Sequence, residues 1–168
     1  MRKVWIAVVL LLGLTGCAEP PVYETMTDVL IPAWEPECRL VLELPEDAVQ
    51  MVMGTEDAKI FLCDRYSIAL QTMPGGDLNR TLFTLSGFAE DALTVMQTEE
   101  QGVKCYECVW SAAGESQPQM CRGLILDDGE YHYTVTVMAP ADMAGGLSED
   151  WQKLTESARL ETIVNTDL

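Results

Sequence analysis

Apolar and polar residues alternate with a period of two through most of the chain after Cys38, which is the pattern of half-buried β-strands. Cys38, Leu40, Leu42 and Leu44 fall on one face, Arg39 and Glu43 fall on the other, and Pro45 ends the run. Seven further strands are predicted on the same grounds, at residues 49–53, 59–63, 67–72, 93–98, 103–111, 120–126 and 131–138.

Two turn signals join the later strands. Asp127-Asp128-Gly129 predicts a tight hairpin with a type I′ turn, because Asp tolerates a positive φ and Gly adopts one freely. Residues 113–118, Ala-Gly-Glu-Ser-Gln-Pro, predict a longer hairpin loop. The second half of the chain is therefore expected to be an antiparallel meander.

Two segments change to a helical period. The first is capped by Asp77, runs to about Ser86 and ends at Gly87. Its apolar stripe consists of Leu78, Leu82 and Leu85. The second begins at Ser148, and its inward face consists of Trp151, Leu154 and Ala158. We therefore predict an α+β domain with a mostly antiparallel sheet of seven or eight strands, one face of which packs against two amphipathic helices.

The N-terminal segment has a different pattern. Arg2-Lys3 precedes an apolar run of eleven residues, 4–14, which is shorter than the roughly 20 residues that a membrane-spanning helix needs. Such a run after a basic start is typical of a secretory signal. An uncleaved anchor helix, or an ordinary cleaved signal followed by a coincidental cysteine, is the alternative.

The tetrad Leu14-Thr15-Gly16-Cys17 resembles the lipobox of bacterial lipoproteins. The resemblance implies that residues 1–16 are a signal peptide and that Cys17 is acylated and becomes the mature N-terminus. It also implies two or three acyl chains, and about two are required for stable anchoring. The protein is therefore expected on the extracytoplasmic face of the cell membrane, held there by its lipid.

The rest of the chain divides into three parts. Residues 17–36 contain the lipidated cysteine and several prolines, which favour an extended tether. Residues 37–160 are long enough for one domain with one core. Residues 161–168 are expected to be a tail.

The chain is strongly acidic, with 27 Asp and Glu residues against 10 Lys and Arg, and a formal net charge of −17. Removal of Arg2 and Lys3 with the signal lowers this charge to −19. The remaining basic residues are scattered singly along the sequence. Such a charge opposes binding to nucleic acid and to anionic lipid headgroups, so nucleic-acid partners are excluded. A solvated acidic surface explains the composition, and a cationic partner is the alternative.

The cysteines do not form a recognisable redox or metal motif. Cys105-Tyr-Glu-Cys108 has redox-motif spacing, but in a strand residues i and i+3 point to opposite faces and cannot readily pair. One Cys-x-x-Cys and one histidine do not make a zinc site. Besides Cys17, five cysteines remain, an odd number: Cys38, Cys63, Cys105, Cys108 and Cys121. A Cys108–Cys121 disulfide across the 113–118 loop is the best candidate, and the alternative is that all five stay reduced.

Known catalytic signatures are missing from the sequence. It contains no Gly-x-Ser-x-Gly elbow, phosphate loop or His-Glu-x-x-His, and it points to no cofactor, metal ligands or catalytic residues. Its one histidine, His132, shares the more polar face of its predicted strand with Thr134 and Thr136, so we expect it at the surface. Asp127 and Asp128 are explained as turn residues.

The order of the elements, with strands, a helix, a strand meander and a closing helix that carries Trp151, resembles the PsbP-like fold. Residues 76–88 and 127–133 also resemble segments of uncharacterised lipoproteins from anaerobic gut bacteria. This resemblance implies an antiparallel sheet flanked by helices, and it carries no catalytic motif.

Three function classes are compatible with the sequence. The first is a membrane-anchored, non-enzymatic accessory or binding domain with a protein partner in the cell envelope. The second is a lipoprotein that binds or senses a small ligand, which would need a pocket between the sheet and the helices. The third is a hydrolase with an unrecognised site.

Overall fold

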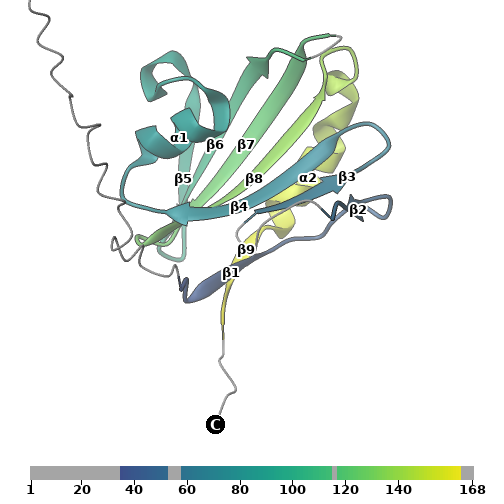
Figure 1. The fold of residues 1–168 in the computed structure, drawn as a ribbon. Helices are drawn as coiled ribbons and strands as arrows, with labels where there is room; N and C mark the ends of the chain where they lie inside the picture. Colours follow the sequence, from purple (N-terminus) through teal and green to yellow (C-terminus); the bar gives the residue numbers. More distant parts are fainter. Residues whose placement is uncertain (1–34, 53–57, 115–116, 164–168) are drawn as a thin grey trace, which may run out of the picture. The chain divides into compact units, whose positions relative to one another are not determined.

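The computed structural model describes residues 35–52, 58–114 and 117–163, which belong to one compact unit (Figure 1). The predicted signal peptide, Cys17 and nearly all of the tether lie outside the described residues. The predicted α+β class and antiparallel sheet are confirmed: the unit has a seven-stranded sheet, a second sheet of two strands, and two α-helices.

The central sheet is antiparallel throughout, with the strand order β2-β3-β4-β8-β7-β6-β5. Its strands are β2 (Val49–Gln50), β3 (Ala58–Leu62), β4 (Ser67–Pro74), β5 (Val95–Glu100), β6 (Val103–Ala112), β7 (Gln119–Asp127) and β8 (Tyr131–Pro140). The predicted meander corresponds to β5–β8. Because β4 pairs with β8, the first half of the chain completes the sheet on the far side of that meander.

The predicted first strand lies outside the central sheet. β1 (Cys38–Val41) pairs with β9 (Arg159–Thr162) in a separate antiparallel ribbon. Sequence patterning did not predict β9, and its last two residues fall in the segment expected to be a tail. Four residues that follow a helix directly give too short an alternating run to be recognised. Their strand conformation depends on pairing with β1, more than a hundred residues away.

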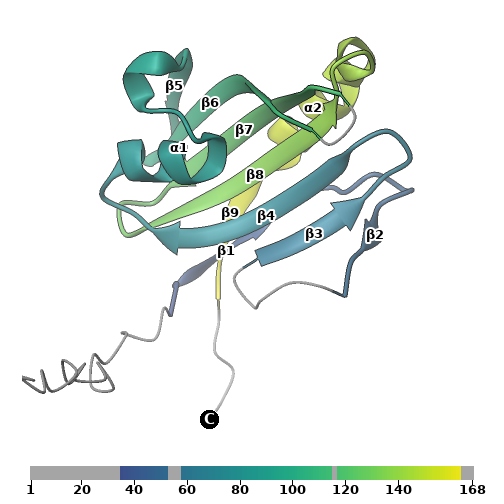
Figure 2. The same ribbon diagram turned by 45° about the horizontal axis from the view of Figure 1, so that its top comes forward.

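The two helices cover opposite faces of the sheet, and the expectation that both cover one face is wrong. α1 (Leu78–Ser86) contributes Leu82 to a buried cluster with Tyr106, Cys108 and Ile125. α2 (Ser148–Ser157) packs on the strand residues of the opposite face, including Leu124 and Val135. In Figure 2, α1 lies in front of the sheet and α2 behind it. Both faces of the central strands are therefore buried.

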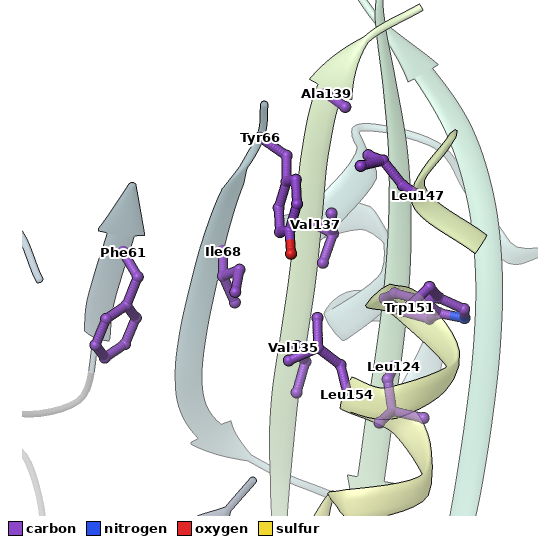
Figure 3. Close-up of a cluster of buried hydrophobic side chains, with 10 residues drawn as sticks. All are labelled: Phe61, Tyr66, Ile68, Leu124, Val135, Val137, Ala139, Leu147, Trp151 and Leu154. Atoms are coloured by element: carbon purple, nitrogen blue, oxygen red, sulfur yellow. The ribbon is translucent and has the colours of Figure 1, made fainter. Parts of the chain in front are cut away.

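The core beneath α2 is the larger cluster (Figure 3). Trp151 and Leu154 point from the helix onto the sheet and are 7% and 1% exposed, which confirms their predicted inward orientation. The indole Nε1 of Trp151 donates a hydrogen bond of 3.2 Å to Glu107 on β6. The guanidinium carbon of Arg122 on β7 lies 6.0 Å from the centre of the same ring. Trp151 therefore attaches α2 to the sheet both by the packing of its ring and by the hydrogen bond of its indole N–H.

The predicted caps of α1 are confirmed. Asp77 Oδ1 accepts a hydrogen bond of 2.9 Å from the backbone N–H of Arg80, and Gly87 ends the helix with a φ of 77°. A short 3₁₀ helix (Glu90–Ala92) then leads into β5, and a second (Ala144–Leu147) leads into α2.

The β7–β8 hairpin differs in detail from the predicted type I′ turn. A type I′ turn needs two positive φ angles, whereas here Gly129 alone has one, 98°. The carboxylate of Asp128 instead accepts hydrogen bonds from the backbone N–H groups of Glu130 and Tyr131, at 3.0 and 2.8 Å. The aspartates therefore act as turn residues, as predicted.

Candidate functional site

Between α1 and the sheet lie two buried polar residues, Thr81 and His132, with the partly exposed Asp127 beside His132; we call these three residues the polar cluster. Thr81 Oγ1 lies 2.7 Å from Nδ1 of His132. On the other side of the ring, Nε2 lies 3.7 Å from Oδ2 of Asp127, a distance longer than a hydrogen bond. The structure thus places a hydroxyl on one side of the imidazole and a carboxylate on the other.

Two elements build this arrangement. Thr81 lies one turn after the cap at Asp77, on the side of α1 that faces the sheet. His132 is near the start of β8 and pairs in register with Asp127 at the end of β7 and with Met73 on β4. The hairpin that holds Asp127 beside His132 therefore also places the imidazole under the first turn of α1.

The expectation that His132 lies at the surface is wrong, since it is 1% exposed. It does share a face with Thr134 and Thr136, as the alternation indicated, but all three are buried. The physical reason is that β8 is a central strand with both faces covered. A signal for this was present, because residues 131–140 contain no charged residue other than the histidine, as expected of a strand buried on both faces.

The order of groups is that of a hydroxyl nucleophile, a base and an orienting carboxylate. If Nε2 carries its hydrogen toward Asp127, then Nδ1 accepts the hydrogen bond from the hydroxyl of Thr81. The hydroxyl, however, belongs to a residue that is only 2% exposed, packed between the helix and the sheet. Burial also lowers the pKa of His132, and the nearby Asp127 opposes this shift. The polar cluster therefore joins α1 to the sheet through a buried imidazole whose protonation is disfavoured.

The cysteine positions bear on the two disulfide questions. Cys105 and Cys108 lie on opposite faces of β6, as predicted for a strand. Cys108 pairs in register with Gly123, and Cys121 pairs with Trp110, so Cys108 and Cys121 are diagonal neighbours on one face. Diagonal neighbours in antiparallel strands lie about 7–8 Å apart, beyond the usual Cα separation of a disulfide.

All five described cysteines are free thiols in this structure. Burial raises the pKa of Cys108 to about 11 and also raises the pKa of Cys105 and of Cys121. These three thiols are therefore protonated at neutral pH and are poor nucleophiles.

A cavity of about 210 Å³ lies between the β1–β9 ribbon and the β3–β4 part of the central sheet; we call it the inter-sheet cavity. Residues 38–40 and Ile163 form one wall, and Lys59 with residues 70–72 forms the other. The alternative function of a small-ligand-binding lipoprotein would need a pocket between the sheet and the helices. This cavity lies elsewhere, because sequence patterning did not show that β1 leaves the central sheet.

Solved structures share this fold at low sequence identity, whereas no known protein family and no curated protein sequence matches the chain. A Bacteroides thetaiotaomicron protein is 13% identical with a TM-score of 0.53; the match covers 76% of this chain and 46% of that one. LpqN of Mycobacterium tuberculosis, described as involved in cell envelope biogenesis, is 10% identical with a TM-score of 0.52, over 77% of this chain and 87% of LpqN. The cyanobacterial PsbP (CyanoP) of Synechocystis is 9% identical with a TM-score of 0.50, over 77% and 96%.

These similarities concern the fold alone. The present chain spans less than half of the Bacteroides protein but most of LpqN and CyanoP. The predicted resemblance to a PsbP-like fold is confirmed at this level. Neither α1 nor α2 is long and apolar enough to cross a membrane, and no other helix in the described part of the chain is.

Proposed function

We propose that this protein is an exported lipoprotein, acylated at Cys17, whose single domain acts on the extracytoplasmic face of the membrane as a non-enzymatic accessory module. The lipobox-like tetrad that ends at Cys17, the short apolar run and the basic start support the anchor. Residues 17–36 would serve as the tether, and residues 37–160 as the domain it carries. The partner is a protein of the cell envelope.

The burial of the polar cluster is the observation that carries the non-enzymatic part of the proposal. A general base must come within hydrogen-bond reach of the proton that it abstracts. The imidazole of His132 is enclosed between α1 and the sheet, and it is the one histidine of the chain. The thiols of the half-buried Cys105 and of the buried Cys108 and Cys121 have raised pKa values, which also weigh against nucleophilic catalysis.

The fold of LpqN supports the cell-envelope setting, because that protein is described as involved in cell envelope biogenesis. The charge of the chain gives a further reason to expect a protein partner. A strongly acidic domain is repelled by anionic headgroups and by nucleic acid, so its contacts are expected with proteins.

The anchor is tested by the variant Cys17→Ala, expressed from the native gene and followed by membrane fractionation. The wild type should pellet with membranes and incorporate labelled fatty acid, whereas the variant should lose both properties. Cys38→Ala is the matched control, because it removes a cysteine of the domain and should leave both properties unchanged. Membrane retention and labelling of Cys17→Ala at the level of the wild type would contradict the proposal.

The accessory role is tested separately by crosslinking in intact cells and purification of the acylated protein from membranes. A defined envelope protein should be recovered with the wild type. It should not be recovered with Cys17→Ala, because this variant is expected to lose its attachment to the membrane. Recovery of the domain alone under crosslinking would contradict a protein partner.

A further inference from the structure

We propose that the inter-sheet cavity binds a small organic carboxylate with an apolar body. This goes beyond the proposed accessory role and does not depend on the anchor. It rests on three features of the cavity, namely its lining, its charges and its size.

The lining is divided about equally between apolar and polar atoms. Leu40 of β1 and Leu70 of β4 belong to its apolar part, and both pack against the core beneath α2. Ile163, which directly follows β9, also lines the cavity, and its backbone N–H donates a hydrogen bond of 2.7 Å to the carbonyl of Glu37. The apolar part of the lining suits a hydrocarbon chain or ring, whereas the hydroxyl groups of a sugar would lose their hydration there.

Two basic residues line the cavity, Lys59 of β3 and Arg39 of β1. Lys59 pairs in register with Leu70 and therefore shares its face of the sheet. Lys59 forms no ion pair within residues 35–52, 58–114 and 117–163. The guanidinium of Arg39 is largely exposed and pairs with Glu161 at 3.2 Å. Among the described residues, a ligand carboxylate would therefore find Lys59 without an ion pair, and at the rim a guanidinium with donors that Glu161 does not use.

The charges around Arg39 leave a local excess of positive charge. Glu161 is shared between Arg39 and Arg159, whose guanidinium lies 2.8 Å away, and these hydrogen bonds lower the pKa of Glu161. Glu37, whose carbonyl accepts the hydrogen bond from Ile163, is a second acidic residue here, so with Lys59 three basic residues accompany two acidic ones. In a chain with 27 acidic and 10 basic residues such a grouping is unusual. It attracts a monoanion and repels a divalent cation.

The cavity volume limits the ligand. About 210 Å³ corresponds to roughly seven water molecules at about 30 Å³ each, which is below the 300–1,000 Å³ typical of sites for drug-sized ligands. A benzoate or a short-chain fatty acid fits this space, and a nucleotide does not. The acidic surface of the domain also disfavours the approach of a larger polyanion.

The test uses the full-length protein in nonionic detergent and 4-fluorobenzoate as the probe, observed by ¹⁹F NMR with empty micelles subtracted. We expect saturable binding that weakens as salt is raised. The neutral analogue 4-fluorobenzamide should not bind saturably. Binding of the amide as tight as that of the acid would overturn the proposal, as would the absence of saturable binding of the acid.

Two charge reversals locate the site. Lys59→Glu should weaken benzoate binding by about tenfold or more, because it turns an attraction into a repulsion at the cavity. Lys104→Glu makes the same change of net charge at an exposed position on β6, and should leave the affinity within about twofold. Both lysines are exposed, so both variants are expected to fold, which circular dichroism checks. Equal weakening by the two variants would show a general charge effect and overturn the site. Displacement of the probe by inorganic phosphate at equal concentration would overturn the requirement for an apolar body.

Discussion

At the scale of single residues, His132 shows how burial decides the role of a chemically versatile group. Its imidazole has a hydroxyl on one side and a carboxylate on the other, as in a catalytic arrangement. Because the imidazole is enclosed under α1, its contacts with Thr81 and Asp127 connect the helix to the sheet. Thr81 was not recognised in advance because it lies 51 positions from His132 in sequence, and only the register of the hairpin and the placement of α1 bring the two together.

The contribution of Thr81 is tested by Thr81→Val, which keeps the shape and removes the hydroxyl. The variant should lose about 1–3 kcal/mol of unfolding free energy, because Nδ1 of His132 would be left buried without its partner. Thr84→Val is the matched control on the exposed side of α1 and should cost less than about 0.5 kcal/mol. Urea unfolding measures both values. Equal losses in the two variants would show that the buried hydrogen bond contributes nothing specific.

His132 also predicts a dependence of stability on pH. Burial lowers its pKa in the folded protein below the ordinary value of 6.5. On acidification, the unfolded chain therefore binds a proton at this imidazole more readily than the folded protein does. Its contribution is fully present above about pH 6.5 and is lost as the pH falls below that value. For one proton the slope is at most about 1.4 kcal/mol per pH unit.

The variant His132→Gln isolates this contribution, because the other titrating groups are common to both proteins. Unfolding free energies measured between pH 7.5 and 5.0 should fall more steeply for the wild type than for the variant. Parallel curves would mean that His132 titrates alike in the folded and unfolded states, contrary to its burial.

At the scale of elements, the sequence patterns located both helices and the strands of the central sheet. The caps at Asp77 and Gly87 were recognisable because they act locally. The pairing of β1 with β9 was not, since four-residue strands carry almost no periodic signal and depend on a distant partner. The coverage of both faces was also missed. On β8 this face carries His132, Thr134 and Thr136, which look solvent-exposed from their polarity, yet all three are buried.

The attachment of α2 is tested by Trp151→Ala. Removal of this ring should cost about 3–5 kcal/mol, the usual effect of deleting a large buried aromatic side chain. Lys153→Ala, an exposed position on the same helix, should change the unfolding free energy by less than about 0.5 kcal/mol. An unchanged urea midpoint for Trp151→Ala would show that α2 does not close the core.

The positions of the cysteines on the strands predict their reactivity. Cys108 and Cys121 are buried on the face beneath α1, so a thiol reagent should modify them only at the rate of unfolding. Non-reducing peptide mapping of the oxidised protein should find no Cys105–Cys108 bridge, because these side chains lie on opposite faces of β6. Such a bridge in good yield, or rapid labelling of Cys108 in the folded protein, would contradict the strand assignment.

At the scale of the whole molecule, the folded domain is preceded in sequence by an N-terminal segment that lies outside the described residues. The fold is shared with proteins as different as LpqN and CyanoP, so it does not by itself specify a function. This chain combines a lipobox-like tetrad, a strongly acidic composition and the polar cluster beneath α1. Under the proposed lipid anchor, the location of the protein would depend on Cys17.

The most direct test of this account is mass spectrometry of the mature N-terminus of the protein from native membranes. We predict an N-terminal peptide that begins at Cys17 and carries the added mass of two or three acyl chains, with no peptide from residues 1–16. Recovery of the protein as a soluble species with residues 1–16 intact would contradict the central claim.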